Sequence, residues 1–197
     1  MNTPNKLSLL RIIMVPLMMV AFMVEFPYHM FVALGIFILA AFTDFLDGHI
    51  ARKYNLITNL GKFLDSIADK MLTTTALILL ACYNTIPQPY GVICLTLFVL
   101  RDIIINFVRQ MAATKGIVLA ANKLGKYKTF AVDIGIPVLM FYMALSSLDV
   151  NATFASIVLW VGYGLIILAS LLNLISGTVY LVQNKSAFID SQEKEEE

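Results

Sequence analysis

The sequence contains few charged residues and few residues with specialised chemistry. Asp, Glu, Lys and Arg make up 14% of the chain, against roughly 25% in an average soluble domain. The only cysteines, Cys82 and Cys94, lie in apolar runs, which argues against a disulfide framework and a cysteine metal site. The only histidines, His29 and His49, lack the spacing of a metal site. The formal net charge of +1 gives no reason to expect a nucleic-acid partner.

The chain also lacks any polar stretch long enough to fold as a soluble domain. Hydrophobic residues make up 59% of the sequence, against roughly 45–50% in soluble domains. The apolar runs are each near the ~20 residues that cross a bilayer as a helix. We therefore predict an all-α, polytopic membrane protein with six transmembrane helices in one bundle. The expected spans are residues 7–24, 30–45, 61–83, 90–113, 129–145 and 154–182.

The two ends of the chain are polar. The first apolar run has no small-residue cleavage site, so we expect a retained helix rather than a signal peptide. Residues 1–185 would form one membrane domain. Residues 186–197 are rich in glutamate, and we expect this acidic tail to be solvated and disordered.

Basic residues are absent from every second connection between the predicted spans. The turns at residues 25–29, 84–89 and 146–153 contain no Lys or Arg. The polar lead, the loops near residues 52–62 and 115–128, and the tail hold nearly all of them. Because basic loops stay on the cytoplasmic side, we place both termini and both basic loops in the cytoplasm of a cell, expected to be bacterial.

Four aspartates stand at the cytoplasmic end of the second and third predicted helices. Asp44 and Asp47 lie three residues apart, and Asp65 and Asp69 four apart, so each pair shares one helix face. A short loop joins the two helices, so the pairs can converge. Clustered carboxylates near a membrane repel one another and need compensation, which Mg²⁺ or Mn²⁺ supplies as a hard ion with oxygen ligands. The pattern therefore predicts a site for two divalent ions.

Small residues and one arginine accompany these carboxylates. Gly48 and Gly61 remove side chains where a ligand or a backbone must come close. Ala51 continues the small face of Gly48, and Arg52 offers a guanidinium fork for phosphate. Two other interpretations stay open: the aspartates only mark helix ends at the interface, or they line the path of a cation- or proton-coupled transporter. A transporter would place its carboxylates near the midplane, whereas these cluster at one end.

The combined pattern resembles the signature of the CDP-alcohol phosphatidyltransferase family. Every position of that signature is filled, and the six-helix pattern is similar as well. The eight positions are Asp44, Asp47, Gly48, Ala51, Arg52, Gly61, Asp65 and Asp69.

The resemblance implies a role for each of these positions. The four aspartates would bind two Mg²⁺ or Mn²⁺ ions, and Asp69 would also act as general base on the acceptor hydroxyl. Gly48, Ala51, Arg52 and Gly61 would line the CDP pocket. The metals would hold the pyrophosphate, the acceptor oxygen would attack the β-phosphorus, and CMP would leave. A homodimer is also implied.

The eight signature positions do not identify the acceptor alcohol, so other residues must. Arg109, Lys123, Lys126 and Lys128 form a predicted cationic patch near the carboxylates, which suits an acceptor that carries its own phosphate. This region resembles the branch of the family that makes phosphatidylglycerophosphate from CDP-diacylglycerol and sn-glycerol 3-phosphate. Inositol phosphate or phosphatidylglycerol are alternative acceptors, and the lysines are alternatively only cytoplasmic residues that meet anionic lipid.

One further pair of charges lies inside the fourth predicted span. Arg101 and Asp102 are adjacent in the sequence and are interpreted as a structural pair. They either neutralise each other or use a partner such as Asp133.

Overall fold

All the regular secondary structure among the described residues is α-helical. The computed structural model describes residues 3–53, 59–114, 123–148 and 150–183, without the side chains of residues 3, 4, 45, 47–53, 59, 60, 62, 113, 114 and 123. No strand occurs in these ranges. The helices are α1 (Thr3–Met23), α2 (His29–Lys53), α3 (Asn59–Cys82), α4 (Tyr90–Thr114), α5 (Lys123–Ser146) and α6 (Ala152–Gln183). The all-α prediction is confirmed.

The helices run beyond several of the predicted spans. α2 continues without a break to Lys53, so Asp44 and Asp47 lie on one helix as expected. α5 begins at Lys123, whereas the sequence placed its span from residue 129 and a polar loop before it. The stretch from Lys123 to Lys128 therefore forms the first turns of a helix, which fixes its basic residues on helical faces.

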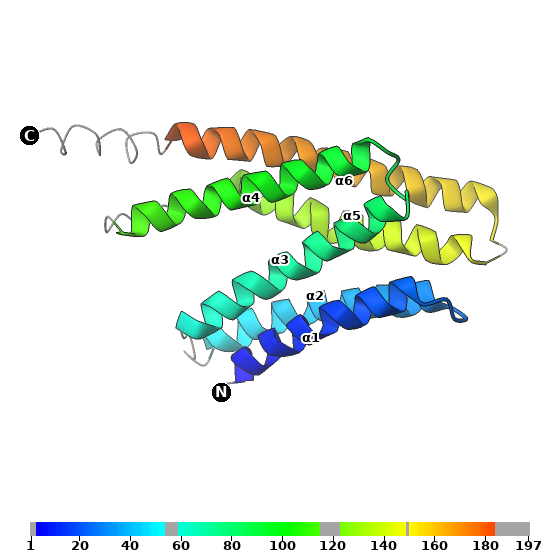
Figure 1. Cartoon of the computed structure of the whole chain (residues 1–197), viewed down its shortest axis with the longest axis horizontal. Helices are drawn as coiled ribbons and strands as arrows, with labels where there is room; N and C mark the ends of the chain where they lie inside the picture. The colour runs from blue at the N-terminus through cyan, green and yellow to red at the C-terminus, as the bar shows by residue number, and fades with distance from the viewer. Residues whose placement is uncertain (1–2, 54–58, 115–122, 149, 184–197) are drawn as a thin grey trace, which may run out of the picture.

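The helix starts and ends alternate between the two ends of the molecule. Figure 1 shows α1, α3 and α5 beginning at the end where α2, α4 and α6 finish. α1 packs on α2 and α3, α5 packs on α6 and α2, and α4 packs on α6 and α3. The carboxylate stretch and the basic residues of α4 and α5 therefore lie at the same end of the bundle, as the charge pattern predicts.

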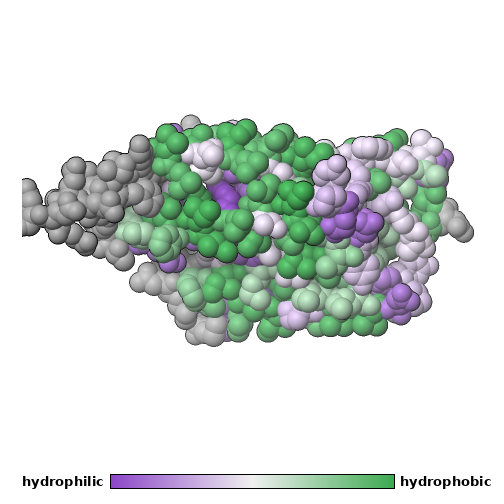
Figure 2. All heavy atoms as spheres, turned by 45° about the horizontal axis from the view of Figure 1, so that its top comes forward, coloured by the Kyte–Doolittle hydropathy of each residue, from purple (hydrophilic) through white to green (hydrophobic). Residues whose placement is uncertain are grey.

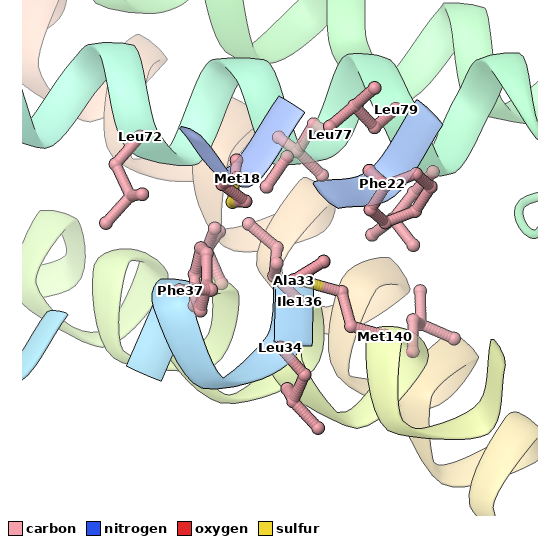
Figure 3. Packing of buried hydrophobic residues seen from close by; sticks show 14 of the residues in the cluster. Met18, Phe22, Ala33, Leu34, Phe37, Leu72, Leu77, Leu79, Ile136 and Met140 are labelled. Carbon is pink, nitrogen blue, oxygen red and sulfur yellow. The ribbon is translucent and has the colours of Figure 1, made fainter. Parts of the chain in front are cut away.

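Large apolar side chains fill the space between α1, α2, α3 and α5. Figure 3 shows Met18, Phe37 and Ile136 pointing toward one another from three of these helices. Each of the three is at most 1% exposed. This core holds the helices at fixed positions and so supports the polar end of the bundle.

The outer surface is also apolar, as expected of a protein in lipid. Figure 2 shows hydrophobic residues over the middle of this face, with hydrophilic residues gathered mainly toward the right-hand end of the view. Trp160 and Phe130 are 71% and 65% exposed. Among the described residues, four helical segments are long and apolar enough to cross a membrane: Asn5–Met23, Tyr90–Ala112, Leu124–Ser146 and Ala152–Gln183. α2 contributes a shorter apolar stretch, His29–Asp44. The protein is therefore a membrane protein.

The glycines of α6 differ in what they contact. A Cβ atom at Gly162 would lie 2.8 Å from Cγ of Leu139 in α5, a side chain that is fully buried. A Cβ atom at Gly164 would meet no described atom within 4 Å. Gly162 therefore allows α5 and α6 to approach closely, whereas Gly164 has no such role.

This difference predicts the effect of two matched substitutions. Gly162→Ala should lower the free energy of unfolding by about 1–3 kcal/mol through overpacking against Leu139. Gly164→Ala, which makes the same change in helix propensity, should not destabilise the protein. Thermal unfolding of the purified variants in detergent measures both, and equal melting temperatures would show that the α5–α6 contact tolerates the added methyl group.

Candidate active site

A single arginine holds the two predicted pairs of carboxylates together. Nη1 of Arg11 in α1 lies 2.6 Å from Oδ1 of Asp44 in α2 and 3.2 Å from Oδ1 of Asp65 in α3. The Arg11 side chain is fully buried, whereas those of Asp44 and Asp65 are about half exposed. Three helices therefore meet at one ionic centre, and the predicted convergence of α2 and α3 carboxylates is seen for this pair.

Arg11 was not among the predicted site residues. It is the only charged residue in the first apolar span, residues 7–24. A lone charge in an apolar helix requires a partner, so its isolation could have marked Arg11 as a candidate site residue. The identity of its partners was not readable, because Asp65 lies 54 positions away in the sequence.

The donor atoms at this centre suit a hard divalent ion. The two Oδ1 atoms reach the same nitrogen, so they converge on one point, and carboxylate oxygens are the ligands that Mg²⁺ and Mn²⁺ prefer. Among the described residues no group of three or more metal-ligand side chains is found, but the side chain of Asp47 lies outside them. The four-carboxylate set therefore stays a prediction.

Asp69 connects the ionic centre to two cavities. It lies one turn after Asp65 on α3 and interacts electrostatically with Arg11 and with Lys128 of α5. It lines both a cavity of about 410 Å³ and a second of about 180 Å³. The smaller cavity extends further along α3 and α4, as far as Leu77 and Phe98. Asp69 is thus placed where a ligand of the larger cavity would meet the carboxylates.

Three of the four predicted acceptor residues line the larger cavity. They are Arg109, Lys126 and Lys128. The side chain of Lys123 lies outside the described residues. The cavity therefore has a cationic wall facing Asp69, as the patch prediction requires.

The basic residues of this wall are not equally available. Lys126 is exposed. Lys128 is buried, donates a hydrogen bond from Nζ to Oδ1 of Asp102 at 3.0 Å, and lies 5.2 Å above the ring of Phe98. Because Asp102 already neutralises much of its charge, Lys128 fits a supporting role better than a direct phosphate contact.

Arg101 and Asp102 form the predicted pair and extend it. Nη1 of Arg101 donates to Oδ1 of Asp102 at 3.0 Å, and Nη2 donates to Oγ of Ser176 in α6, also at 3.0 Å. Asp102 therefore bridges Arg101 and Lys128, and the network joins α4, α5 and α6. Asp133, the alternative partner, lies on the wall of the smaller cavity.

The predicted CDP pocket lies largely outside the described side chains. Gly48, Ala51 and Arg52 belong to the last turns of α2, but only their backbone course is described. Gly61 belongs to the first turn of α3. The helical spacing of the pocket residues is as expected, and their contacts stay a prediction.

Comparison with known proteins points to one family. A family model described as CDP-alcohol phosphatidyltransferase matches residues 1–168. A Bacillus subtilis protein named CDP-diacylglycerol–glycerol-3-phosphate 3-phosphatidyltransferase is 35% identical, over 94% of this chain and 96% of that protein. A Rickettsia bellii protein of the same name is 32% identical, over 95% and 97%. One from Cereibacter sphaeroides is 34% identical, over 75% and 67%.

The ionic centre predicts how the protein responds to divalent ions. Arg11→Met removes the cation that lies between Asp44 and Asp65, so the variant should lose about 1–3 kcal/mol of stability in the absence of divalent ions. Mg²⁺ or Mn²⁺ should then raise its melting temperature more than that of the original protein. Thermal unfolding in detergent, with EDTA and with increasing Mg²⁺, measures this difference.

Lys6→Met is the matched control, because Lys6 is an exposed cation on the same helix. The melting temperatures of this variant, with EDTA and with Mg²⁺, should equal those of the original protein. An Mg²⁺ response of Arg11→Met no larger than that of the Lys6 variant would contradict ion binding between the two carboxylates.

Proposed function

The chain belongs to the CDP-alcohol phosphatidyltransferase family, and we propose that it transfers the phosphatidyl group of CDP-diacylglycerol to sn-glycerol 3-phosphate. The products are phosphatidylglycerophosphate and CMP, which places the reaction in phospholipid biosynthesis. The observation that carries the proposal is the position of Asp69, which lies one turn from Asp65 and also lines a cavity with a cationic wall. The full-length similarity to enzymes of this name supports it.

The donor side of the reaction is assigned to α2 and α3. Asp44, Asp47, Asp65 and Asp69 would hold two Mg²⁺ or Mn²⁺ ions. Such ions, when bound, offset the negative charge of a pyrophosphate and of the oxygens that enter and leave at phosphorus. Gly48, Ala51, Arg52 and Gly61 would leave room for the cytidine diphosphate and contact it.

The acceptor side is assigned to the larger cavity. Its volume of about 410 Å³ lies within the roughly 300–1,000 Å³ of typical small-molecule sites. Arg109 and Lys126 would bind the phosphate of glycerol 3-phosphate, with Arg101 and Lys128 behind them. A hydroxyl of the same molecule would then lie beside Asp69, whose carboxylate accepts its proton as the oxygen attacks the β-phosphorus.

The proposal includes an orientation in the cell membrane. All six helices would cross the bilayer as one bundle, with the active site at the cytoplasmic ends of α2 and α3 and both termini in the cytoplasm. Figure 1 supports this, since it shows the first residues of α1, α3 and α5 at the same side as the last residues of α2, α4 and α6, and the sequence carries Lys6, Arg109 and Lys126 near such ends. Residues 1–185 would form the membrane domain, the acidic tail would follow, and the enzyme would act as a homodimer.

The first test is a direct assay of the reaction. The purified protein, given CDP-diacylglycerol and Mg²⁺ or Mn²⁺, should release CMP with sn-glycerol 3-phosphate and not with inositol phosphate, phosphatidylglycerol or glycerol. Labelled acceptor and thin-layer separation of the lipid product identify the transfer. Release of CMP only with inositol phosphate would contradict the assignment of glycerol 3-phosphate as acceptor. No release with any acceptor would contradict the proposed transferase activity.

A second test concerns the proposed metal ligands. Asp65→Asn keeps the shape of the side chain and an oxygen that can accept from Arg11, and removes the charge. CMP release should therefore fall by roughly a hundredfold or more while the variant still folds. Glu25→Gln is the matched control, since Glu25 is an exposed carboxylate in the connection between α1 and α2. Near-normal turnover by the Asp65 variant would count against its role as a ligand.

A further inference from the structure

Arg109 is held in place by a tyrosine from the last helix. Its Nε donates a hydrogen bond to Oη of Tyr180 at 3.2 Å, and its guanidinium carbon lies 5.5 Å from the centre of the same ring. Tyr180 is 2% exposed and packs with Ile105 and Val108 of α4, so the ring itself is fixed. The bond to Tyr180 uses Nε, and the terminal nitrogens that form the phosphate-binding fork are not consumed by it.

Arg101 is held by the same helix, one turn earlier. Its Nη2 donates to Oγ of Ser176, which is fully buried and in turn donates to the backbone oxygen of Asn173 at 3.2 Å. A Cβ atom at Gly177 would lie 3.1 Å from Cγ of Arg101, so the missing side chain makes room for the arginine. α6 thus fixes two arginines that lie two turns apart on α4 and line the same cavity.

The part of α6 that makes these contacts lies apart from the carboxylate signature. The signature ends at Asp69, and the residues matched by the family model end at 168, before Ser176 and Tyr180. The shared chemistry is transfer from a CDP-activated lipid, which the carboxylates serve. A determinant of the acceptor is free to lie elsewhere, and both anchored arginines face the cavity assigned to the acceptor.

We propose that Tyr180 and Ser176 are positioning residues. Tyr180 fixes the guanidinium of Arg109 to receive the phosphate of the acceptor, Ser176 fixes Arg101 behind it, and α6 thereby sets the preference for a phosphorylated acceptor. The identity of that acceptor rests on the proposed function. Neither residue touches the reacting atoms. Their effect arises because an arginine already held in its binding orientation loses less conformational freedom when phosphate binds.

The hydroxyl of Tyr180 is the atom to remove. Tyr180→Phe keeps the buried ring and its contact with the guanidinium, and removes only the oxygen that accepts from Nε. The KM for sn-glycerol 3-phosphate should rise roughly tenfold, while kcat and the KM for CDP-diacylglycerol stay within about twofold. Inorganic phosphate, used as a competitive inhibitor, should weaken by a similar factor. Ser176→Ala should produce the same pattern through Arg101.

Thr178→Val is the matched control on the same helix. Thr178 is exposed, and its hydroxyl donates only to backbone oxygens of its own helix, at Leu174 and Ile175. This variant should keep the original values of all four quantities. It removes a hydroxyl from α6 without approaching either arginine.

Three outcomes would overturn the proposal. They are an unchanged KM for the acceptor in both variants, an equal loss in every kinetic parameter together with a lower melting temperature, and failure of Tyr180→Phe to fold. The second and third would show that the two residues only stabilise the α4–α6 contact. Failure of the proposed function is separate: if the original protein used inositol phosphate instead, the same selective rise in KM for that acceptor would still support positioning by α6.

Discussion

The polar end of this membrane protein depends on how the buried charge of Arg11 is compensated. A fully buried guanidinium in an apolar helix is costly unless it is paired, and Asp44 and Asp65 pair it from two other helices. The same contacts draw together two carboxylates that would otherwise repel each other. One interaction therefore fixes the relative positions of α1, α2 and α3 and brings potential metal ligands to one point. The apolar core below it has no such directional requirement.

A second ionic network, on α4 and α5, lines the cavity that Asp69 also lines, and its charges are arranged the other way round. Here one carboxylate, Asp102, lies between Arg101 and Lys128, so the cluster keeps an excess of positive charge beside a cavity. That excess suits an anionic ligand, and α6 holds its position through Ser176 and Tyr180. Asp69 stands between a centre suited to cations and a wall suited to phosphate, which is the arrangement that a phosphoryl-transfer site needs.

Much of this architecture could be predicted because it is local in the sequence. The lengths of the hydrophobic runs predict the helices. Spacings of three and four residues predict that the two aspartates of each pair lie on one face of their helix. The contacts that matter most were not local: Tyr180 lies 71 positions from Arg109, and Ser176 lies 75 from Arg101. No periodicity specifies such pairs. The sequence also did not show that Lys128 is paired. Its partner Asp102 lies 26 positions away, and the pairing makes Lys128 part of an ionic network.

The length of α6 has a consequence for the membrane itself. Its 32 residues span about 48 Å at 1.5 Å per residue, well beyond the roughly 30 Å of a bilayer's hydrocarbon layer. The helix must therefore tilt within that layer or extend past it. Tyr180 lies near the C-terminal end of α6, where its hydroxyl accepts the hydrogen bond from Arg109. A helix longer than the hydrocarbon layer thus has room at one end for the residues that hold Arg101 and Arg109.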